Sequence, residues 1–248
     1  MIEARHVCKS FGANRVLNDV SLTIETGESV VIIGRSGCGK SVLLKHLIGL
    51  TRPDAGQVLV DDEDLTGMSE RQLLEVRRKF GMLFQSAALF DSMTVAENVG
   101  FALRRDRRWT EAEITRKIAE ALEMVDLPGL EGKKPSELSG GMRKRVGLAR
   151  AIVYQPAILL YDEPTTGLDP VMSDSIDQLI IRLCQRLKVT SIVVTHDMRS
   201  TRRVGQRILM LHQGRVHATG TPDQIFNSTD PVVSHFVEGV ADPKEILF

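Results

Sequence analysis

The sequence has no long apolar run. Its strongest runs, Ser29–Ile33 and Ala157–Tyr161, are far shorter than the roughly 20 residues that a membrane-spanning helix needs. The segment Met1–Ser10 contains no apolar stretch of the kind that a secretory signal peptide carries. From these absences we expect a protein that is soluble, or peripheral to a partner that spans the membrane.

Cysteine is scarce and charge is balanced. The three cysteines, Cys8, Cys38 and Cys184, show no metal-ligand spacing, which favours a reducing cytoplasm over a disulfide framework. Lys and Arg number 32, Asp and Glu number 32, and the formal net charge is zero. A neutral balance disfavours binding through overall charge, so we expect no nucleic-acid partner.

Short apolar runs alternate with helical stretches such as Lys40–Leu50 and Ser173–Leu187. This alternation predicts an α/β fold with a mostly parallel sheet and crossover helices. Strand signals disappear between about Gln85 and Tyr154, which predicts a helical insertion. The expected strands are Ala4–Cys8, Val20–Ile24, Val30–Ile33, Gly56–Val60, Phe80–Phe84, Ile158–Tyr161, Ser191–Thr195 and Ile208–Leu211, with a hairpin turn at Gly214.

A glycine-rich segment between a buried strand and a helix fits the phosphate-loop pattern G-x-x-x-x-G-K-[ST]. Its glycines let backbone N–H groups turn inward around an anion, and the helix N-terminus adds partial positive charge. Lys40 can reach the β- and γ-phosphates of a nucleotide, and the Ser41 hydroxyl can bind Mg²⁺. The segment is Gly34-Arg35-Ser36-Gly37-Cys38-Gly39-Lys40-Ser41.

Two carboxylates end the apolar strand Ile158–Tyr161. Ligands of open α/β sheets bind at the carboxyl ends of the strands, so we expect both carboxylates near the phosphate loop. Asp162 is suited to hold Mg²⁺ through water, and Glu163 to polarise the attacking water. A solvated strand end is the alternative interpretation, and the phosphate loop weakens it.

A second anion-binding helix start is predicted at Leu138-Ser139-Gly140-Gly141-Met142, which precedes the basic, helix-forming run Arg143–Tyr154. Ser139 can cap the helix, and the two glycines let its N–H groups face a phosphate. A chain with one phosphate loop has little use for a second such start. The pattern makes sense if this start serves the nucleotide of another copy.

With these motifs the sequence resembles the ABC transporter ATPases. Leu138–Met142 is similar to their signature, Gln85 to the Q-loop residue, Gly167-Leu168-Asp169 to the D-loop and His196 to the switch histidine. Phe11 stands where the family places an aromatic residue on adenine. Phe11 replaces the commoner tyrosine and Met142 the commoner glutamine, and neither change removes a catalytic group.

The resemblance implies a P-loop NTPase (RecA-like) core, an N-terminal antiparallel β subdomain and an inserted α-helical subdomain. It also implies a head-to-tail dimer that holds two ATP molecules, each between one copy's phosphate loop and the other copy's signature. Gln85 would touch Mg²⁺, and His196 would contact the γ-phosphate. The implied catalytic residues are Glu163, His196, Lys40 and Gln85. Mg²⁺ would be held by Ser41, Gln85 and Asp162. The ATP-binding residues would be Phe11, Gly34, Arg35, Ser36, Gly37, Cys38, Gly39, Lys40, Ser41, Val42, Ser139, Gly140, Gly141 and Asp169.

On this basis, residues 1–85 and 155–227 are expected to form the ATP-binding core with the β subdomain. Residues 86–154 are expected to form the signature subdomain, and residues 228–248 a C-terminal extension for dimer or partner contact. In the extension, Asp230-Pro231 predicts a helix start, and Val233, Phe236, Val237 and Val240 repeat at helical spacing. Docking of this stripe onto its own domain is the alternative.

A narrower resemblance is carried by residues 81–95 together with residues 138–145. These segments resemble the ATPases of Mla/Mce-type transporters, which move phospholipids or other hydrophobic compounds between envelope membranes. The resemblance implies an integral membrane permease, an Mce-domain protein and a STAS-domain protein as partners. It also implies a place at the cytoplasmic face of the inner membrane. Amino-acid importer ATPases share much of the pattern and remain an alternative.

Other interpretations stay open. A soluble ABC protein of ribosomes or DNA usually has two such domains or a long coiled-coil insert, and the sequence has neither. Intact Lys40, Asp162, Glu163 and His196 disfavour a nucleotide sensor without turnover. The basic run at residues 104–108 suits a solvated helix end or a lipid headgroup. Cys38 fills a small-residue slot, although a helix N-terminus can also lower a thiol's pKa.

Overall fold

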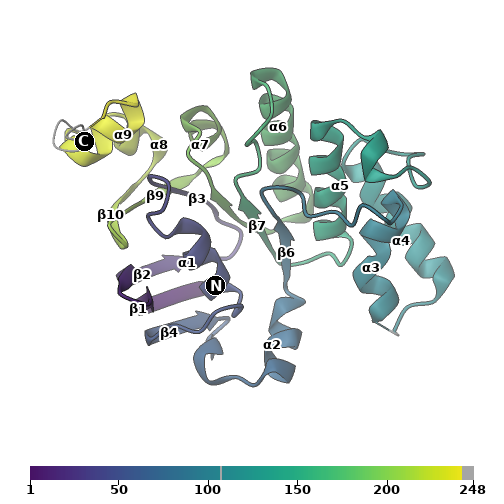
Figure 1. Ribbon diagram of the computed structural model, residues 1–248, viewed down its shortest axis with the longest axis horizontal. Helices are drawn as coiled ribbons and strands as arrows, with labels where there is room; N and C mark the ends of the chain where they lie inside the picture. Colours follow the sequence, from purple (N-terminus) through teal and green to yellow (C-terminus); the bar gives the residue numbers. More distant parts are fainter. Residues whose placement is uncertain (107, 242–248) are drawn as a thin grey trace. The chain divides into compact units, whose positions relative to one another are not determined.

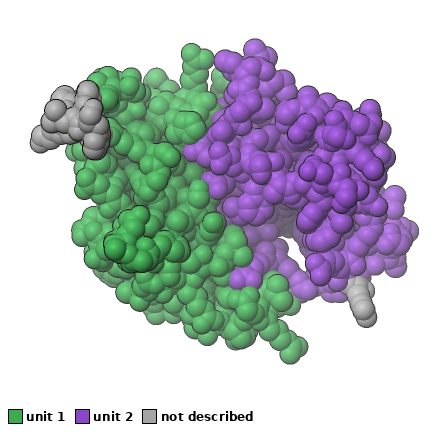
Figure 2. Space-filling model, viewed as in Figure 1, with its two compact units in different colours: residues 1–76, 192–248 green, residues 77–191 purple. Residues whose placement is uncertain are grey.

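The computed structural model describes residues 1–106 and 108–241, and the chain divides into two compact units (Figures 1 and 2). The first consists of Met1–Val76 and Ile192–Phe248, and the second of Arg77–Ser191. The predicted domain boundaries at residues 85, 154 and 227 were drawn from motifs, and they stay a prediction. The predicted fold class is confirmed.

An antiparallel sheet with strand order β2-β1-β4-β5 lies in the first unit (Figure 1). Ile2 of β1 pairs with Ile24 of β2 on one side and with Val60 of β4 on the other. All three side chains are fully buried, so this row of apolar residues fixes the register of the sheet. The strands are β1 (Ile2–Phe11), β2 (Asn14–Ile24), β4 (Ala55–Val60) and β5 (Glu63–Asp64).

The first unit also contains the strand order β10-β9-β3-β8. β3 and β9 are parallel, with Val30 opposite Arg207, and β9 and β10 form the predicted hairpin at Gly214. The whole run Val30–Ile33 is buried, as expected for a parallel strand covered on both faces. The strands are β3 (Ser29–Ile33), β8 (Thr190–Val194), β9 (Arg207–His212) and β10 (Arg215–Gly220).

Five α-helices accompany these strands in the described part of the first unit. The predicted helix start at Asp230 is confirmed, because its carboxylate accepts the N–H groups of Val232 and Val233. The helix expected over Lys40–Leu50 ends at Leu47. The helices are α1 (Lys40–Leu47), α2 (Glu70–Arg77), α7 (Met198–Val204), α8 (Pro222–Phe226) and α9 (Pro231–Glu238), with the 3-10 turn η1 (Leu65–Gly67).

In the second unit, β6 and β7 run parallel, with Leu83 opposite Tyr161. Between them the described residues contain helices and no strand, so the predicted helical insertion is confirmed. Ile114 and Ile118, which are one helical turn apart on α4, are buried. The elements are β6 (Phe80–Leu83), α3 (Val95–Arg105), α4 (Glu111–Met124), η2 (Pro135–Glu137), α5 (Gly140–Ile152), β7 (Ile158–Asp162) and α6 (Pro170–Leu187).

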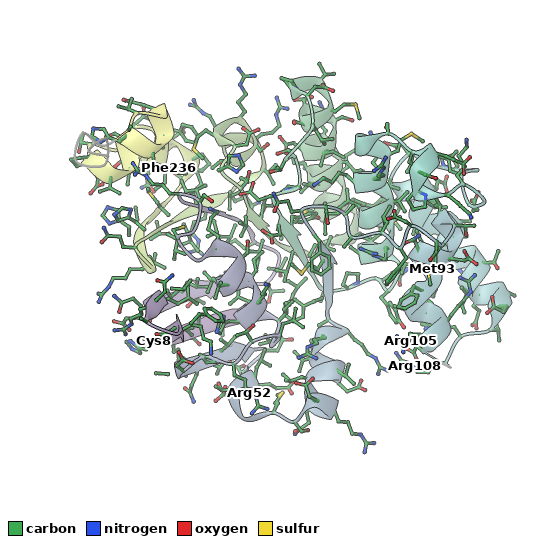
Figure 3. All side chains as sticks on the ribbon, in the orientation of Figure 1. Cys8, Arg52, Met93, Arg105, Arg108 and Phe236 are labelled. Atoms are coloured by element: carbon green, nitrogen blue, oxygen red, sulfur yellow. The ribbon has the colours of Figure 1, made fainter. Side chains whose placement is uncertain are left out.

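No helix within residues 1–106 and 108–241 is long and apolar enough to cross a membrane. In α9, Val233 is fully buried, whereas Val240, just beyond the helix, is 49% exposed. Figure 3 shows Phe236 on α9. The terminal residues Ile246, Leu247 and Phe248 lie outside the described part of the chain.

Candidate nucleotide site

The loop between β3 and α1 holds three glycines in backbone conformations that favour glycine. Gly34 has a φ of 150°, Gly37 a φ of 78° and Gly39 a φ of 103°. A Cβ atom on Gly34 would lie 2.3 Å from the carbonyl oxygen of Leu211, and one on Gly39 would lie 2.9 Å from that of Val16. Neither position admits a side chain, so the backbone itself forms the wall of the predicted phosphate loop.

The start of α1 lacks the side-chain cap that other helices of the chain have. Its N-cap residue, Gly39, makes no side-chain hydrogen bond, and its first turn contains no acidic residue. In contrast, the hydroxyls of Thr94 and Thr110 accept backbone N–H groups at the starts of α3 and α4. The N-cap of α1 therefore supplies no acceptor of its own, which suits a helix start that binds an anion.

Lys40, the first residue of α1, folds back over the loop and is only 7% exposed. Its Nζ donates hydrogen bonds to the carbonyl oxygens of Gly34 at 2.7 Å and Arg35 at 3.0 Å. The ammonium group is therefore held at the loop, where a phosphate would meet it. Burial raises the pKa of the Cys38 thiol, against the opposing effect of the Lys40 charge. This corrects the idea that the helix N-terminus lowers that pKa.

His196 and Phe11 also belong to the first unit. His196 is exposed and follows Thr195, whose N–H donates to the Ile32 carbonyl oxygen at 3.2 Å. It therefore leaves β8 at the sheet edge where the phosphate loop leaves β3. Phe11 ends β1 and is 53% exposed, and the Lys9 ammonium lies 5.6 Å from its ring centroid. Its open ring face suits the predicted stacking on a base.

Asp162 and Glu163 lie at the end of β7 in the second unit. Asp162 is the last residue of the strand, and Glu163 follows in a left-handed conformation with φ 51°. For a residue other than glycine such a conformation costs of order 1–3 kcal/mol and is often found at functional sites. Glu163 is 9% exposed, and its Oε2 accepts a hydrogen bond from the Thr166 hydroxyl at 3.2 Å.

Gln85 emerges at the same edge of the second unit's strands as Glu163. Leu83 lies opposite Tyr161 in parallel register, and each of the two predicted residues comes two positions later. Gln85 itself is exposed. The structure therefore brings together the Q-loop residue and the predicted catalytic carboxylate, as parallel strands should.

Lys144 of α5 belongs to the basic run Arg143–Tyr154 and was not among the predicted site residues. It is 5% exposed, and its Nζ donates hydrogen bonds to the backbone carbonyl oxygens of Gln85 and, at 3.3 Å, Glu163. Burial lowers the pKa of this lysine, while the carboxylates of Glu163 and Asp162 act in the opposite direction. No local pattern identifies this residue, because its partners are distant in sequence.

The second predicted anion site lies at the start of α5. The Ser139 hydroxyl accepts the N–H of Met142 at 3.3 Å, which confirms the predicted cap. Gly140 is exposed, and a Cβ atom there would meet only Leu168, at 3.5 Å, whereas one on Gly141 would lie 2.2 Å from Met172. The signature glycines therefore pack beside the D-loop segment.

The D-loop residue Asp169 is exposed and caps α6 by accepting the N–H groups of Val171 and Met172 at 2.9 Å each. This cap explains the residue locally. Its predicted contact with ATP remains a prediction, because that contact would come from a second copy.

The basic run at residues 104–108 has acidic neighbours. Arg108 makes three hydrogen bonds to the carboxylate of Asp106, and Arg104 lies 3.6 Å from Glu111. Figure 3 shows Arg105 and Arg108 together at the end of α3. These pairs favour a solvated helix end over a lipid contact. Arg107, the remaining member of the run, lies outside the described residues.

Within the described residues no group of three or more His, Cys, Asp or Glu side chains could hold a metal ion. The predicted Mg²⁺ donors Ser41, Gln85 and Asp162 include a single carboxylate and stay a prediction. Mg²⁺ in nucleotide sites keeps several waters and is shared with the phosphates, so one carboxylate and one hydroxyl fit it.

A buried strand, a glycine-rich loop and an uncapped helix that begins with lysine define a P-loop NTPase. The family model described as ABC transporter matches residues 17–166. The chain belongs to the ABC transporter family, whose ATPase domains bind ATP with Mg²⁺ and couple its hydrolysis to transport.

The curated relatives cover nearly the whole chain and carry different names. A probable ribonucleotide transport ATP-binding protein of Mycobacterium leprae is 44% identical, over 96% of this chain and 69% of that protein. The chloroplastic protein trigalactosyldiacylglycerol 3 of Arabidopsis thaliana is 40% identical, over 98% and 74%. A sulfate/thiosulfate import ATP-binding protein of Cucumis sativus is 42% identical, over 96% and 68%. The chain spans about two thirds of the length of the mycobacterial relatives it matches, 69% in one case and 66% in another.

Solved structures agree with the family. A bacterial ABC transporter cassette, solved as a dimer, matches with a TM-score of 0.82 at 35% identity, over 90% of this chain and 99% of that one. A subunit of the cbiONQ transporter complex from Clostridium perfringens matches with a TM-score of 0.84 at 27% identity, over 94% and 93%.

Proposed function

We propose that the chain is the ATP-hydrolysing subunit of a transporter that moves a lipid, of the phospholipid class, between membranes of the cell envelope. It acts as a head-to-tail pair on a separate integral membrane permease, at the cytoplasmic face of the inner membrane. The lipid cargo is supported by the Mla/Mce-like segments at residues 81–95 and Met142. It is also supported by the Arabidopsis relative, whose name contains that of a glycolipid.

The observation that carries the pairing is the exposed start of α5. Gly140 is solvent-accessible and uncrowded, and the first turn of α5 has no acidic residue that would repel a phosphate. The chain already has a complete phosphate loop at α1, so a second accessible anion-binding helix start suits the nucleotide of another copy. A similar chain was solved as a dimer.

In this assembly each predicted residue has one role. The phosphate-loop residues, from Gly34 to Val42, bind the phosphates, and Phe11 stacks on adenine. Ser41, Gln85 and Asp162 would hold Mg²⁺, which neutralises phosphate charge when it is bound. Glu163 accepts a proton from the attacking water, and His196 contacts the γ-phosphate. Ser139, Gly140, Gly141 and Asp169 come from the partner copy.

A solute importer is the second candidate function. The sulfate/thiosulfate import relative is 42% identical to the chain, which is close to the 44% of the mycobacterial relative. The ATP-binding residues are common to both candidates, because cargo is bound by other subunits.

The catalytic role is tested with Glu163→Gln. The amide keeps the shape of the side chain but cannot accept the water's proton. ATP binding should be retained, and turnover should fall by about 10²–10⁴, the usual effect of a positioned general base. ATP affinity and single-turnover hydrolysis are measured together. A variant that keeps more than about a third of wild-type turnover would remove Glu163 from this role.

The cargo is tested on the complex that co-purifies with the chain from its native membrane. After reconstitution into nanodiscs, ATP hydrolysis is measured with added phospholipid, sulfate, ribonucleotide or amino acid. We expect stimulation by phospholipid alone. Stimulation by one of the polar solutes, with no response to lipid, would replace the lipid proposal with the importer proposal.

The last segment is proposed to contact a second copy or a partner, of which a STAS-domain and an Mce-domain protein are the proposed classes. Val233 already packs within its own unit, so the part available for a partner is narrower than the predicted stripe. It begins with Val240, which is 49% exposed.

A further inference from the structure

Helix α5 carries two basic side chains that bind backbone carbonyl groups of the loop after β6. Lys144 donates to the carbonyl oxygens of Gln85 and Glu163, as described above. Arg150 donates to those of Ala87 and Ala88, at 2.6 Å each. One helix therefore fixes the loop after β6 at two points, and Lys144 alone reaches the end of β7 as well.

Three of the four residues held in this way have unfavourable backbone conformations. Ala87, Ala88 and Glu163 have φ values of 60°, 46° and 51°. Left-handed conformations of residues other than glycine persist only where the surroundings stabilise them. Hydrogen bonds from a charged donor are stronger than neutral ones, so α5 supplies the stabilisation that these conformations require.

Burying the ammonium group of Lys144 costs more free energy than burying an apolar side chain of similar size. Lys144 is 5% exposed, and its Nζ donates hydrogen bonds to two carbonyl oxygens. Removing a charge from water costs free energy that these carbonyl groups and the nearby carboxylates of Glu163 and Asp162 only partly return, and an apolar side chain would pack at lower cost. A lysine at this place therefore needs a reason beyond packing.

We propose that Lys144 is a positioning residue for ATP hydrolysis, which holds the backbone of Glu163 and of Gln85 in place from the helix that begins at the signature. The inference rests on the proposed roles of Glu163 and Gln85. The carboxylate of Glu163 is steered from two sides, by Lys144 at its backbone carbonyl and by Thr166 at Oε2. Any shift of α5 moves the same nitrogen atom that holds both segments.

The test compares Lys144→Met with Arg150→Met. Methionine keeps an unbranched apolar stem of similar length and removes the charged donor. Both changes delete a cation of α5 that binds loop carbonyls, but only the first releases Glu163. We expect Lys144→Met to lower kcat by about 10–100-fold with little change in KM for ATP, since a misplacement of about 1 Å can cost about 10²-fold.

Arg150→Met should lower the melting temperature at least as much as Lys144→Met does. It should leave kcat within about threefold of wild type, because residues that only support the fold affect stability more than chemistry. Lys144→Arg, which keeps charged donors, should restore most of the lost kcat. A kcat for Lys144→Met no lower than that of Arg150→Met would overturn the proposal. So would an arginine variant as slow as the methionine variant at normal melting temperature.

A double variant separates this inference from the proposed function. If Lys144 acts through Glu163, adding Lys144→Met to Glu163→Gln should lower turnover no further. An undiminished effect on that background would overturn the claim that Lys144 acts through Glu163. If Glu163→Gln alone keeps normal turnover, the proposed role of Glu163 fails instead, and the inference fails with it.

Discussion

Two helices of this protein begin at glycine-rich sequences, and they begin differently. α1 starts after Gly39, without a side-chain cap, from glycines too crowded to carry a Cβ atom. α5 starts after Ser139, which caps it, and its first residue, Gly140, is exposed and uncrowded. The first start is packed into its own unit and lacks a side-chain cap, which suits an anionic ligand. The second start is already capped by Ser139, and its exposed first residue suits contact with another molecule.

The largest effect is expected at α1. Lys40→Ala removes the ammonium group that lies at the phosphate loop, and hydrolysis should fall by about 10²–10³ or more, as when a charge-stabilising donor is lost. Lys45→Ala, an exposed position on the same helix, is the matched control and should behave as wild type. Hydrolysis and ATP binding are measured for both. Equal activity of the two variants would remove α1 from the nucleotide site.

At α5 the expected effect is smaller and of a different kind. Gly140→Asp places a carboxylate where a phosphate of the other copy would bind, so like charges repel and turnover should fall by about tenfold or more. Melting temperature and ATP binding by the isolated chain should stay normal, because a Cβ atom fits at this position. Gly132→Asp adds the same charge where no atom lies within 4 Å, and is the control. Equal turnover of the two variants would contradict a phosphate site at α5.

The two units should also differ in how their ion pairs respond to pH. In the first unit, Arg207 donates to both oxygens of the Glu28 carboxylate, at 2.6 and 2.8 Å, and to the Thr23 carbonyl oxygen. The hydrogen bonds of Arg207 hold the pKa of Glu28 below its usual value. That contribution to stability is present above the unfolded-state pKa of about 4.3 and is lost as the pH falls through the folded-state pKa.

Arg207→Met should therefore lower the free energy of unfolding at pH 7 by about 1–3 kcal/mol, and the difference should shrink below about pH 4. Arg182→Met, which removes an exposed partner of Asp126 in the second unit, should cost less than about 1 kcal/mol. Denaturant unfolding at several pH values measures both. A larger loss of unfolding free energy for Arg182→Met than for Arg207→Met would contradict this comparison.

A further comparison concerns two positions in the last segment of the chain. Val233→Ala should destabilise the chain by about 1–3 kcal/mol, because the side chain is fully buried. Val240→Ser should leave stability unchanged and weaken assembly with a second copy or a partner, which size-exclusion chromatography of the complex measures. If Val240→Ser changes neither, the segment only docks onto its own unit.

The site was predictable wherever local sequence carries the chemistry. The strand before Gly34, the helix after Lys40 and the cap at Asp230 follow from apolar periodicity and capping preferences. The helices α7 and α8 are too short for periodicity to reveal. Lys144 could not be found, because its acceptor Gln85 is 59 residues away. The raised pKa of the Cys38 thiol could not be predicted either, because the burial of the thiol depends on the folded loop.

The most direct test of the account mixes two impaired variants. Lys40→Ala damages the phosphate loop and Gly140→Asp damages the start of α5. If each nucleotide lies between the two helix starts of different copies, a mixed pair has one doubly damaged site and one intact site. The mixture should then hydrolyse ATP well above the rate of either variant alone. A mixture no faster than the average of the two separate variants, at protein concentrations where pairs form, would contradict the shared site.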